Sequence, residues 1–268
     1  MRVFFIIASS LLIYNVSFSQ EFQAKAIYMS KTKLHFDFGN RKIPEDAKKK
    51  MQERMDQALQ KTYVLNFNKT ASLYMELPTI ENSDQNRGRA AMFASMFGGP
   101  SIGESYKNIA TKESKRAVEF FGKNFLVQGP LQAFQWKLEK QIKKIGKYTC
   151  FKATTSIAKK QHPFSKVKDS TTTKTTVVVW YSPEIPVSLG PDKYWGLPGL
   201  ILSVQAGDTQ ILCTQLVLNL KEKTEIKAPK KGKKLTELEF EEIVEKKTIE
   251  IKQRFKQGRG ADAKRAKN

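Results

Sequence analysis

The sequence predicts a mainly β (α+β) domain, in which a single strongly curved antiparallel sheet, or open β-barrel, carries two packed helices. Most of the chain alternates apolar and polar residues with the period of two that half-buried strands show. Strand-like segments follow one another about every ten residues with turn residues between them, which favours antiparallel connections. The sequence has no long crossover helices between these segments, which argues against a parallel, Rossmann-like sheet.

Four segments carry the strand pattern most clearly. In "AFQWKLEK", Phe134, Trp136 and Leu138 fall on one face and polar residues on the other. "TTVVVWYS" is apolar on both faces, so we expect this strand to lie under a helix or inside the curve of the sheet. The same alternation predicts strands at "TASLYMEL" (Ala71, Leu73, Met75, Leu77) and "QILCTQLVLNL" (Leu212, Leu216, Leu218, Leu220).

Two segments have the helical period instead. Residues 44–61 begin with Pro44 and two acidic residues, as helix N-termini do. Residues 236–257 open with Thr236 and Glu239 at the spacing of a capping box. Each helix has one apolar stripe, which we expect to pack on the sheet. The stripes are Ala47, Met51, Met55, Ala58 and Leu59 in the first helix, and Phe240, Ile243, Val244, Ile251 and Phe255 in the second.

The N-terminus has the form of an export signal. Residues 1–19 contain a basic residue, an apolar core, and the small residues Ser17 and Ser19 before the cleavage point. The apolar core is shorter than the ~20 residues of a membrane span, and no later segment is long and uncharged enough to be one. An uncut N-terminal anchor is the alternative. We therefore expect one domain over residues 20–257, in the periplasm, at the outer membrane or secreted, followed by a disordered basic tail at 258–268.

The chain is strongly basic, with a formal net charge of +21. Such a charge favours acidic partners, for example lipopolysaccharide phosphates or nucleic acid. The lysines are spread through every segment, however, and the dense clusters at 230–234 and 264–267 flank the last helix as solvated tails do. Export and the lack of a basic motif interleaved with aromatic residues argue against nucleic acid as the partner.

The two cysteines, Cys150 and Cys213, both lie in strand-like runs. In an oxidising compartment they form either a disulfide or two buried free thiols that pack as small apolar residues. Sequence spacing gives no distance between the two strands, so both alternatives stay open.

Residues 82–104 fit neither the strand nor the helix pattern. The segment is polar at its start, has Met92, Phe93, Met96 and Phe97 at its centre, and continues into Gly-Gly-Pro. Four large apolar side chains together are unusual on an exposed loop. We predict that they cover the mouth of the curved sheet as a movable lid that contacts ligand; a surface loop packed on the core is the alternative.

The sequence offers no legible catalytic, metal or phosphate site. Pro198 stands where the nucleophile of a G-x-S-x-G motif would be, and the S-x-x-K matches in this lysine-rich chain lack their companion motifs. His35 and His162 are far apart and have no acidic or cysteine partners at ligand spacing. Glycine-rich phosphate loops are missing as well. These observations predict a protein that is not an enzyme and that needs no cofactor.

The stretch "GLPGLI" at Gly196 to Ile201 has a structural explanation. Pro198 suits the second position of a type II turn, and Gly199 suits the positive φ of the third position. We therefore expect a tight turn around Gly196, Leu197, Pro198 and Gly199 that starts a core strand, with a ligand site as the alternative.

The same residues carry a family resemblance. The hexapeptide, "FQWKLEKQIKKIGKYTCFKATT" (134–155) and "VVWYSPEIPVSLGPDKYWGLPGLIL" (178–202) resemble the GLPGLI family of exported Gram-negative bacterial proteins, as do the early "AKAIY" strand and the basic last helix. The segment around Met92 to Phe97 lies outside the shared pattern. The resemblance implies an exported, single-domain protein, and it transfers no activity, cofactor or site residue.

Two functions fit these expectations. The first is binding of an apolar or amphipathic ligand, such as a lipid, an acyl chain, a peptide or another apolar small molecule, in the curved sheet. The alternative is an interaction module that docks on an envelope or outer-membrane protein through the "PEIPVSLGP" edge. An envelope hydrolase is disfavoured because no nucleophile and base can be paired.

Overall fold

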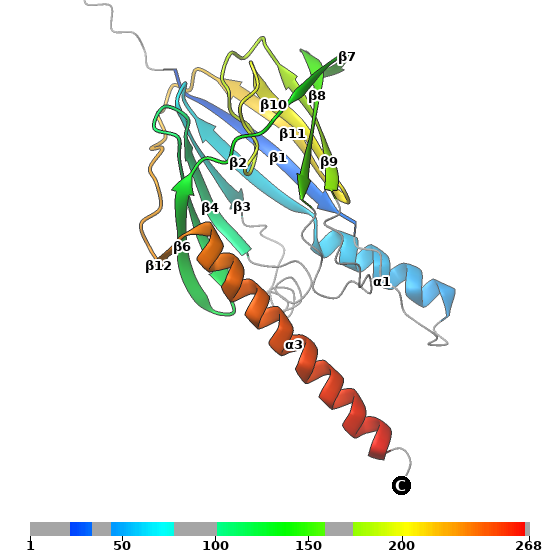
Figure 1. The fold of residues 1–268 in the computed structure, drawn as a ribbon. Coiled ribbons are helices and arrows are strands. Elements are labelled where there is room, and N and C mark those ends of the chain that lie inside the picture. Colours follow the sequence, from blue (N-terminus) through cyan, green and yellow to red (C-terminus); the bar gives the residue numbers. More distant parts are fainter. Residues whose placement is uncertain (1–21, 34–43, 78–100, 159–173, 266–268) are drawn as a thin grey trace, which may run out of the picture.

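The computed structural model of the chain describes residues 22–33, 44–77, 101–158 and 174–265 (Figure 1). The side chains of 51, 54, 55, 58, 101, 102, 252 and 254–265 are not described. The predicted signal peptide (1–19) and the predicted lid residues Met92, Phe93, Met96 and Phe97 lie outside the described residues. The last four residues of the 82–104 segment begin a strand.

The described part of the chain forms one sheet of 12 strands, in the order β12-β6-β5-β4-β3-β2-β1-β11-β10-β9-β8-β7. This confirms a mainly β fold built on a single sheet. The sheet is mixed, because β12 pairs with β6 in parallel while the other pairs are antiparallel, and it is not closed into a barrel. Figure 1 shows β12 and β7 at its two ends. The strands are β1 (Ala24–Thr32), β2 (Lys61–Phe67), β3 (Ala71–Leu77), β4 (Ser101–Asn108), β5 (Glu113–Phe120), β6 (Lys123–Pro130), β7 (Lys137–Ile145), β8 (Tyr148–Ala158), β9 (Lys174–Ser182), β10 (Leu200–Ala206), β11 (Thr209–Leu218) and β12 (Lys233–Leu235).

β-Bulges bend the sheet and change which residues face the core. Between β1 and β11 the register shifts at Ile27/Tyr28, so that Thr214 is the extra residue. The Thr214 hydroxyl donates a hydrogen bond to the carbonyl oxygen of Ile27 at 3.2 Å. Beyond the bulge Cys213 packs on the core while Leu212 is exposed. The predicted grouping of Leu212 with Leu216 and Leu218 is therefore wrong, because the bulge reverses the alternation.

The strand predicted at "AFQWKLEK" begins later than expected. β7 starts at Lys137, and Phe134 and Trp136 lie in the connection from β6, where they pack partly buried against the core. The strands predicted at 70–77 and 175–182 are confirmed as β3 and β9.

The main core lies between the inner face of the sheet and the connection from β9 to β10. We call the inner face the side that carries Ala26, Leu65, Tyr74 and Val179, all of which are buried. The connection spans residues 183–199, and we refer to it as the 183–199 loop. A second, smaller core joins β5, β6 and β12 to the last helix through Val118, Phe120, Phe125, Val127, Leu235 and Phe240.

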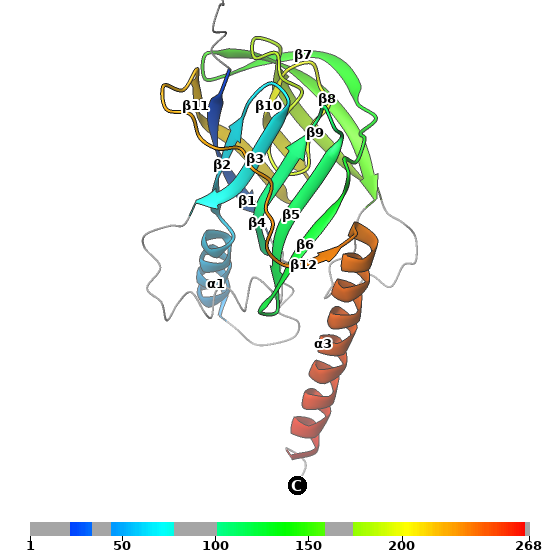
Figure 2. The same cartoon turned by 90° about the vertical axis from the view of Figure 1, so that its left-hand side faces the viewer.

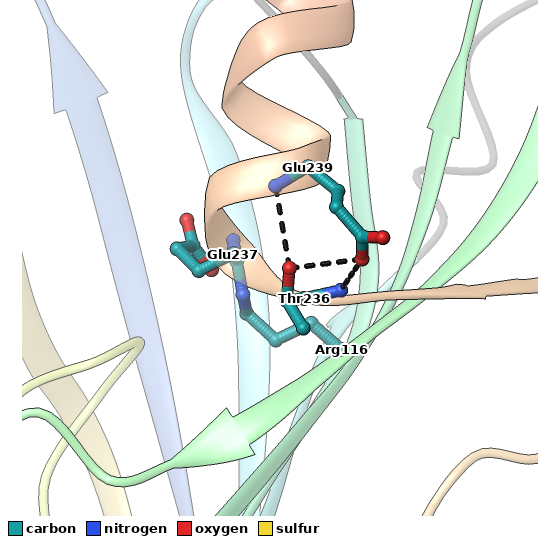
Figure 3. A network of polar contacts seen from close by, with 4 residues as sticks. All are labelled: Arg116, Thr236, Glu237 and Glu239. Carbon is teal, nitrogen blue, oxygen red and sulfur yellow. Dashed lines mark hydrogen bonds and ion pairs between the residues drawn. The ribbon is translucent and has the colours of Figure 1, made fainter.

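The last helix, α3 (Glu237–Arg265), begins as predicted and ends later. Its capping box is confirmed, because the Thr236 N–H donates to Glu239 Oε2 at 2.7 Å and the Glu239 N–H donates to Thr236 Oγ1 at 3.3 Å (Figure 3). Phe240 packs on the rings of Phe120 and Phe125. The predicted helix end at Gln257, with a disordered tail from residue 258, is wrong, because the helix continues to Arg265. Its glycines cost only ~1 kcal/mol each, and no proline follows them.

The first helix, α1 (Glu45–Ala58), is shorter than the predicted 44–61, because β2 starts at Lys61 and pairs with β1. Ala47, the first residue of its predicted stripe, is exposed, and the side chains of Met51, Met55 and Ala58 lie outside the described residues. Figures 1 and 2 show both helices extending from one end of the sheet. No helix in the described ranges is both long and apolar enough to cross a membrane.

Candidate functional site

The 183–199 loop fills the inner face of the sheet with its own side chains. Its apolar residues alternate with exposed prolines and polar residues, so that one side of the loop is buried. The stretch "PEIPVSLGP" therefore has its apolar side chains Ile185, Val187 and Leu189 in the core, and it is not a strand at the edge of the sheet. The buried residues are Ile185, Val187, Leu189, Tyr194 and Leu197.

The turn within "GLPGLI" differs from the predicted type II turn. Gly199 does not have a positive φ, and its N–H donates to the carbonyl oxygen of Leu197 at 2.8 Å. This bond closes a three-residue γ-turn centred on Pro198, whose ring fixes φ near the value that an inverse γ-turn requires. The positive φ, +95°, belongs to Gly196. The prediction identified the corner correctly but assigned the left-handed conformation to the wrong glycine.

Gly199 is needed for close packing. A Cβ atom at this position would lie 2.3 Å from the carbonyl oxygen of Ser182, and a Cβ at Gly190 would lie 2.8 Å from Cβ of Ile201. Both contacts are far shorter than van der Waals distance, so the loop packs against β9 and β10 only because these two positions have no side chain.

Lys107 of β4 holds the loop from the opposite side. Its ammonium donates to the carbonyl oxygens of Gly190 (2.7 Å), Asp192 (2.5 Å) and Tyr194 (3.1 Å). The residue is 1% exposed, and burial lowers the pKa of Lys107 to about 7, with the Asp192 carboxylate acting in the opposite direction. All three N–H donors of the ammonium are thus used to fix the loop backbone.

Other side chains fix the same loop. The Tyr28 hydroxyl donates to the carbonyl oxygen of Ile201 at 2.8 Å, just beyond the loop. The Trp136 indole donates to the carbonyl oxygen of Trp195 at 2.8 Å. Glu184 Oε1 accepts a hydrogen bond from the Thr149 N–H at 2.8 Å. Glu184 therefore has a structural partner at the start of β8.

Tyrosines surround Lys107 and Asp192 on the inner face. Tyr63 and Tyr74 stack with ring centroids 4.7 Å apart. Burial is the largest cause that raises the pKa of Tyr63, Tyr74 and Tyr194 well above the ordinary value of a tyrosine. The nearby Asp192 carboxylate raises the pKa of all three further. These hydroxyls are protonated at neutral pH, so they are unsuited to act as general bases.

Ser72 lies opposite Lys107 across the β3–β4 pair, and its hydroxyl has no hydrogen-bond partner in the described structure. Serine and lysine can form a nucleophile and base in enzymes. Here Ser72 is 0% exposed, and the lysine nitrogen is held by three carbonyl groups. The pair is therefore closed to a substrate in this conformation.

The structure holds both cysteines as free thiols, Cys150 buried on β8 and Cys213 half-buried on β11. Burial raises the pKa of Cys150 to about 11 and that of Cys213 to about 12. Little reactive thiolate forms at neutral pH under these conditions. Within the described ranges no group of three or more His, Cys, Asp or Glu side chains could hold a metal ion.

The strand β7 offers a different kind of site. It forms one end of the sheet, and no described strand pairs with its outer edge. Leu138 and Ile142 lie opposite Ala153 and Phe151 of β8, so their side chains point to the same side as the main core. They are nevertheless 57% and 58% exposed, because no neighbouring strand covers them.

The β7 edge is also basic. Its one carboxylate, Glu139, accepts a hydrogen bond from Thr154 at 3.0 Å and forms an ion pair with Lys152 at 3.1 Å. The contact with Lys152, which has the larger effect, and the hydrogen bond from Thr154 both lower the pKa of Glu139. Lys143 lies over the ring of Trp180, 4.2 Å from its centroid. The strand β7 carries four lysines, Lys137, Lys140, Lys143 and Lys144, and Lys147 follows in the turn to β8.

A family model described as "Protein of unknown function (Porph_ging)" matches residues 136–203. The matched segment contains β7, β8, β9 and the 183–199 loop. A comparison with curated proteins finds no match.

Two solved structures of PNGF-II are similar to this chain. The form in space group C2 has 15% sequence identity and a TM-score of 0.49, covering 83% of this chain and 32% of that one. The form in space group P21 has 13% identity and a TM-score of 0.48, covering 83% of this chain and 33% of that one. The chain thus spans about a third of the length of these proteins.

Neither the burial of Lys107 nor the free edge of β7 is predicted by the sequence pattern. The sequence contains 47 lysines and arginines, and nothing in "SIGESYKN" marks one of them as buried. The alternation does predict a strand that includes Leu138, with Leu138 on its apolar face. Its position at the end of the sheet depends on strand order, which local periodicity does not contain.

Proposed function

We propose that this chain is an exported, non-catalytic interaction module of the GLPGLI family that binds an extended segment of an envelope protein along β7. Strand addition of this kind uses the unpaired N–H and C=O groups of a sheet edge for affinity and alternate side chains for specificity. The observation that carries the proposal is the combination of an open edge with Leu138 and Ile142, which are exposed on the core-facing side.

Strand addition would complete the local packing. A partner strand beside β7 would cover Leu138 and Ile142 and extend the main core by one strand. Each backbone hydrogen bond contributes ~0.5–1.5 kcal/mol net, so several bonds and two covered apolar side chains give a specific complex. The family match within residues 136–203 supports family membership. The N-terminal sequence supports export.

The predicted ligand-binding function has less support from the geometry. Residues of the 183–199 loop occupy the inner face where an apolar or amphipathic ligand was expected. The predicted docking edge, "PEIPVSLGP", has its apolar side chains in the core. For these reasons the proposed docking surface is β7.

The experiment places a photo-crosslinking amino acid at Leu138 in the full chain, in the cells that produce it. The matched control is the same amino acid at Leu238 of α3, an apolar residue that is 73% exposed on the helix that packs on β6, near the opposite end of the strand order from β7. We expect one discrete protein to crosslink at Leu138 and not at Leu238. In the purified non-crosslinked complex, hydrogen exchange should slow at the β7 amides.

Substitution gives the second arm of the test. Leu138→Asp combined with Ile142→Asp should abolish the complex, whereas Leu238→Asp should leave it intact. A partner that binds without slowing exchange in β7, or that binds the double variant with unchanged affinity, contradicts the proposal.

A further inference from the structure

We infer that the segment docking on β7 is acidic: an extended stretch of another protein in which apolar residues alternate with Asp or Glu. This inference rests on the strand docking proposed above and adds the chemistry of the partner. It follows from the charge of the edge and from the face on which each side chain lies.

The charge of the edge is one-sided. Among described residues, no ion pair is formed by Lys137, Lys140 or Lys144, while Glu139 is already paired with Lys152. A strand added beside β7 would therefore meet several lysines and no unpaired carboxylate. Opposite charges on neighbouring strands stabilise a sheet, and like charges destabilise it.

The alternation follows from the register. Leu138 and Ile142 lie on the core-facing side, opposite Ala153 and Phe151. Lys137 and Lys143 are their neighbours in sequence, and successive side chains of a strand point to opposite faces. The register shifts between Leu138 and Ile142, and on each side of that shift a partner strand meets an apolar side chain on one face and the ammonium group of Lys137 or Lys143 on the other. This arrangement selects apolar and acidic residues at neighbouring positions of the partner.

The same lysines disfavour a second copy of this chain as the occupant. Two β7 edges brought together would set four lysines against four, and edge lysines are a known device against such pairing. An anionic membrane surface would attract the lysines but would leave the backbone edge unused. The combination of edge, apolar face and basic face fits an acidic strand best.

The test uses two synthetic twelve-residue peptides with the same apolar residues at alternate positions. One carries Glu and the other Lys at the remaining positions. Binding to the full chain is measured by fluorescence anisotropy, and the site by hydrogen exchange. We expect the Glu peptide to bind at least about ten-fold more tightly, to slow exchange in β7, and to weaken about ten-fold between 50 and 500 mM salt.

Paired variants locate the charge effect. Lys137→Glu with Lys143→Glu should reverse the preference towards the Lys peptide. Lys69→Glu with Lys123→Glu changes the net charge equally at two exposed lysines outside β7, and it should leave the preference unchanged.

The other outcomes overturn the inference in recognisable ways. Equal affinity for both peptides with β7 protected removes the acidic specificity and leaves strand docking standing. The absence of β7 protection by either peptide overturns the inference, and the crosslinking experiment then decides strand docking by itself. Protection of β7 by phosphatidylglycerol vesicles alone, or by self-association, assigns the edge to a membrane or to a second copy.

Discussion

The 183–199 loop and the strand β7 both lie in the segment that the family model matches, yet they use their residues in opposite ways. The loop buries its apolar side chains, and its backbone carbonyls accept hydrogen bonds from Lys107 and Trp136. β7 leaves one backbone edge and two large apolar side chains exposed. Glycines and prolines that suggest a binding site are used for packing, whereas the lysine-rich strand β7 leaves its outer edge unpaired in the described structure.

The largest expected effect concerns the packing of the loop. Gly199→Ala should lower the free energy of unfolding by about 3 kcal/mol or more, because the added methyl group overlaps the backbone of Ser182. Urea denaturation measures the change. The control is Gly129→Ala in β6, where a Cβ meets nothing within 4 Å, and it should stay within about 1 kcal/mol of the original protein. Equal effects at the two positions would show that the loop is loosely packed.

The next effect concerns the buried lysine. Lys107→Met should reduce the free energy of unfolding by about 1–3 kcal/mol, because three loop carbonyls lose their donor while the cost of burying a charge is removed. Lys123→Met, at an exposed position, should change it by less than about 0.5 kcal/mol. An Lys107→Met protein as stable as the original would mean that the loop does not depend on this anchor.

Lys107 should also give a distinctive pH dependence. Its pKa is lowered in the folded protein to about 7, from the ordinary lysine value, so between these values the unfolded chain binds more protons than the folded one. Stability should therefore rise with pH, by roughly 1–2 kcal/mol between pH 7 and 8.5. Above that range the raised pKa values of the buried tyrosines and cysteines act in the opposite direction. The difference in the free energy of unfolding between the original protein and Lys107→Met, measured as a function of pH, isolates this rise. Parallel plots of stability against pH for the two proteins would contradict it.

The smallest expected effect on stability concerns the edge. Leu138→Asp with Ile142→Asp should change the free energy of unfolding by less than about 1 kcal/mol, because both side chains are already exposed. Thermal unfolding checks this. A large loss of stability would place these side chains in the core and remove the contrast with the loop.

Local pattern predicted much of the fold. Alternation identified β3, a run of residues that is apolar on both faces identified β9, and the Thr236–Glu239 spacing identified the start of α3. Errors arose where distant segments decide the outcome. The bulge at Thr214 reversed the face of Leu212, and contact with the Ser182 backbone determined the role of Gly199. The burial of Lys107 and the open edge of β7 depend on strand order, which periodicity does not reveal.

The most direct test of the contrast is hydrogen exchange of the whole chain, alone and in complex with the protein that crosslinks at Leu138. In the free chain we expect the β7 amides at the open edge to exchange fast. The amides of Gly199 and Ile201 should exchange slowly, because they donate hydrogen bonds to the carbonyl oxygens of Leu197 and Leu189 in the loop. In the complex, exchange should slow in β7 and stay unchanged in the 183–199 loop. Slowed exchange in the loop with no change in β7 would contradict the account.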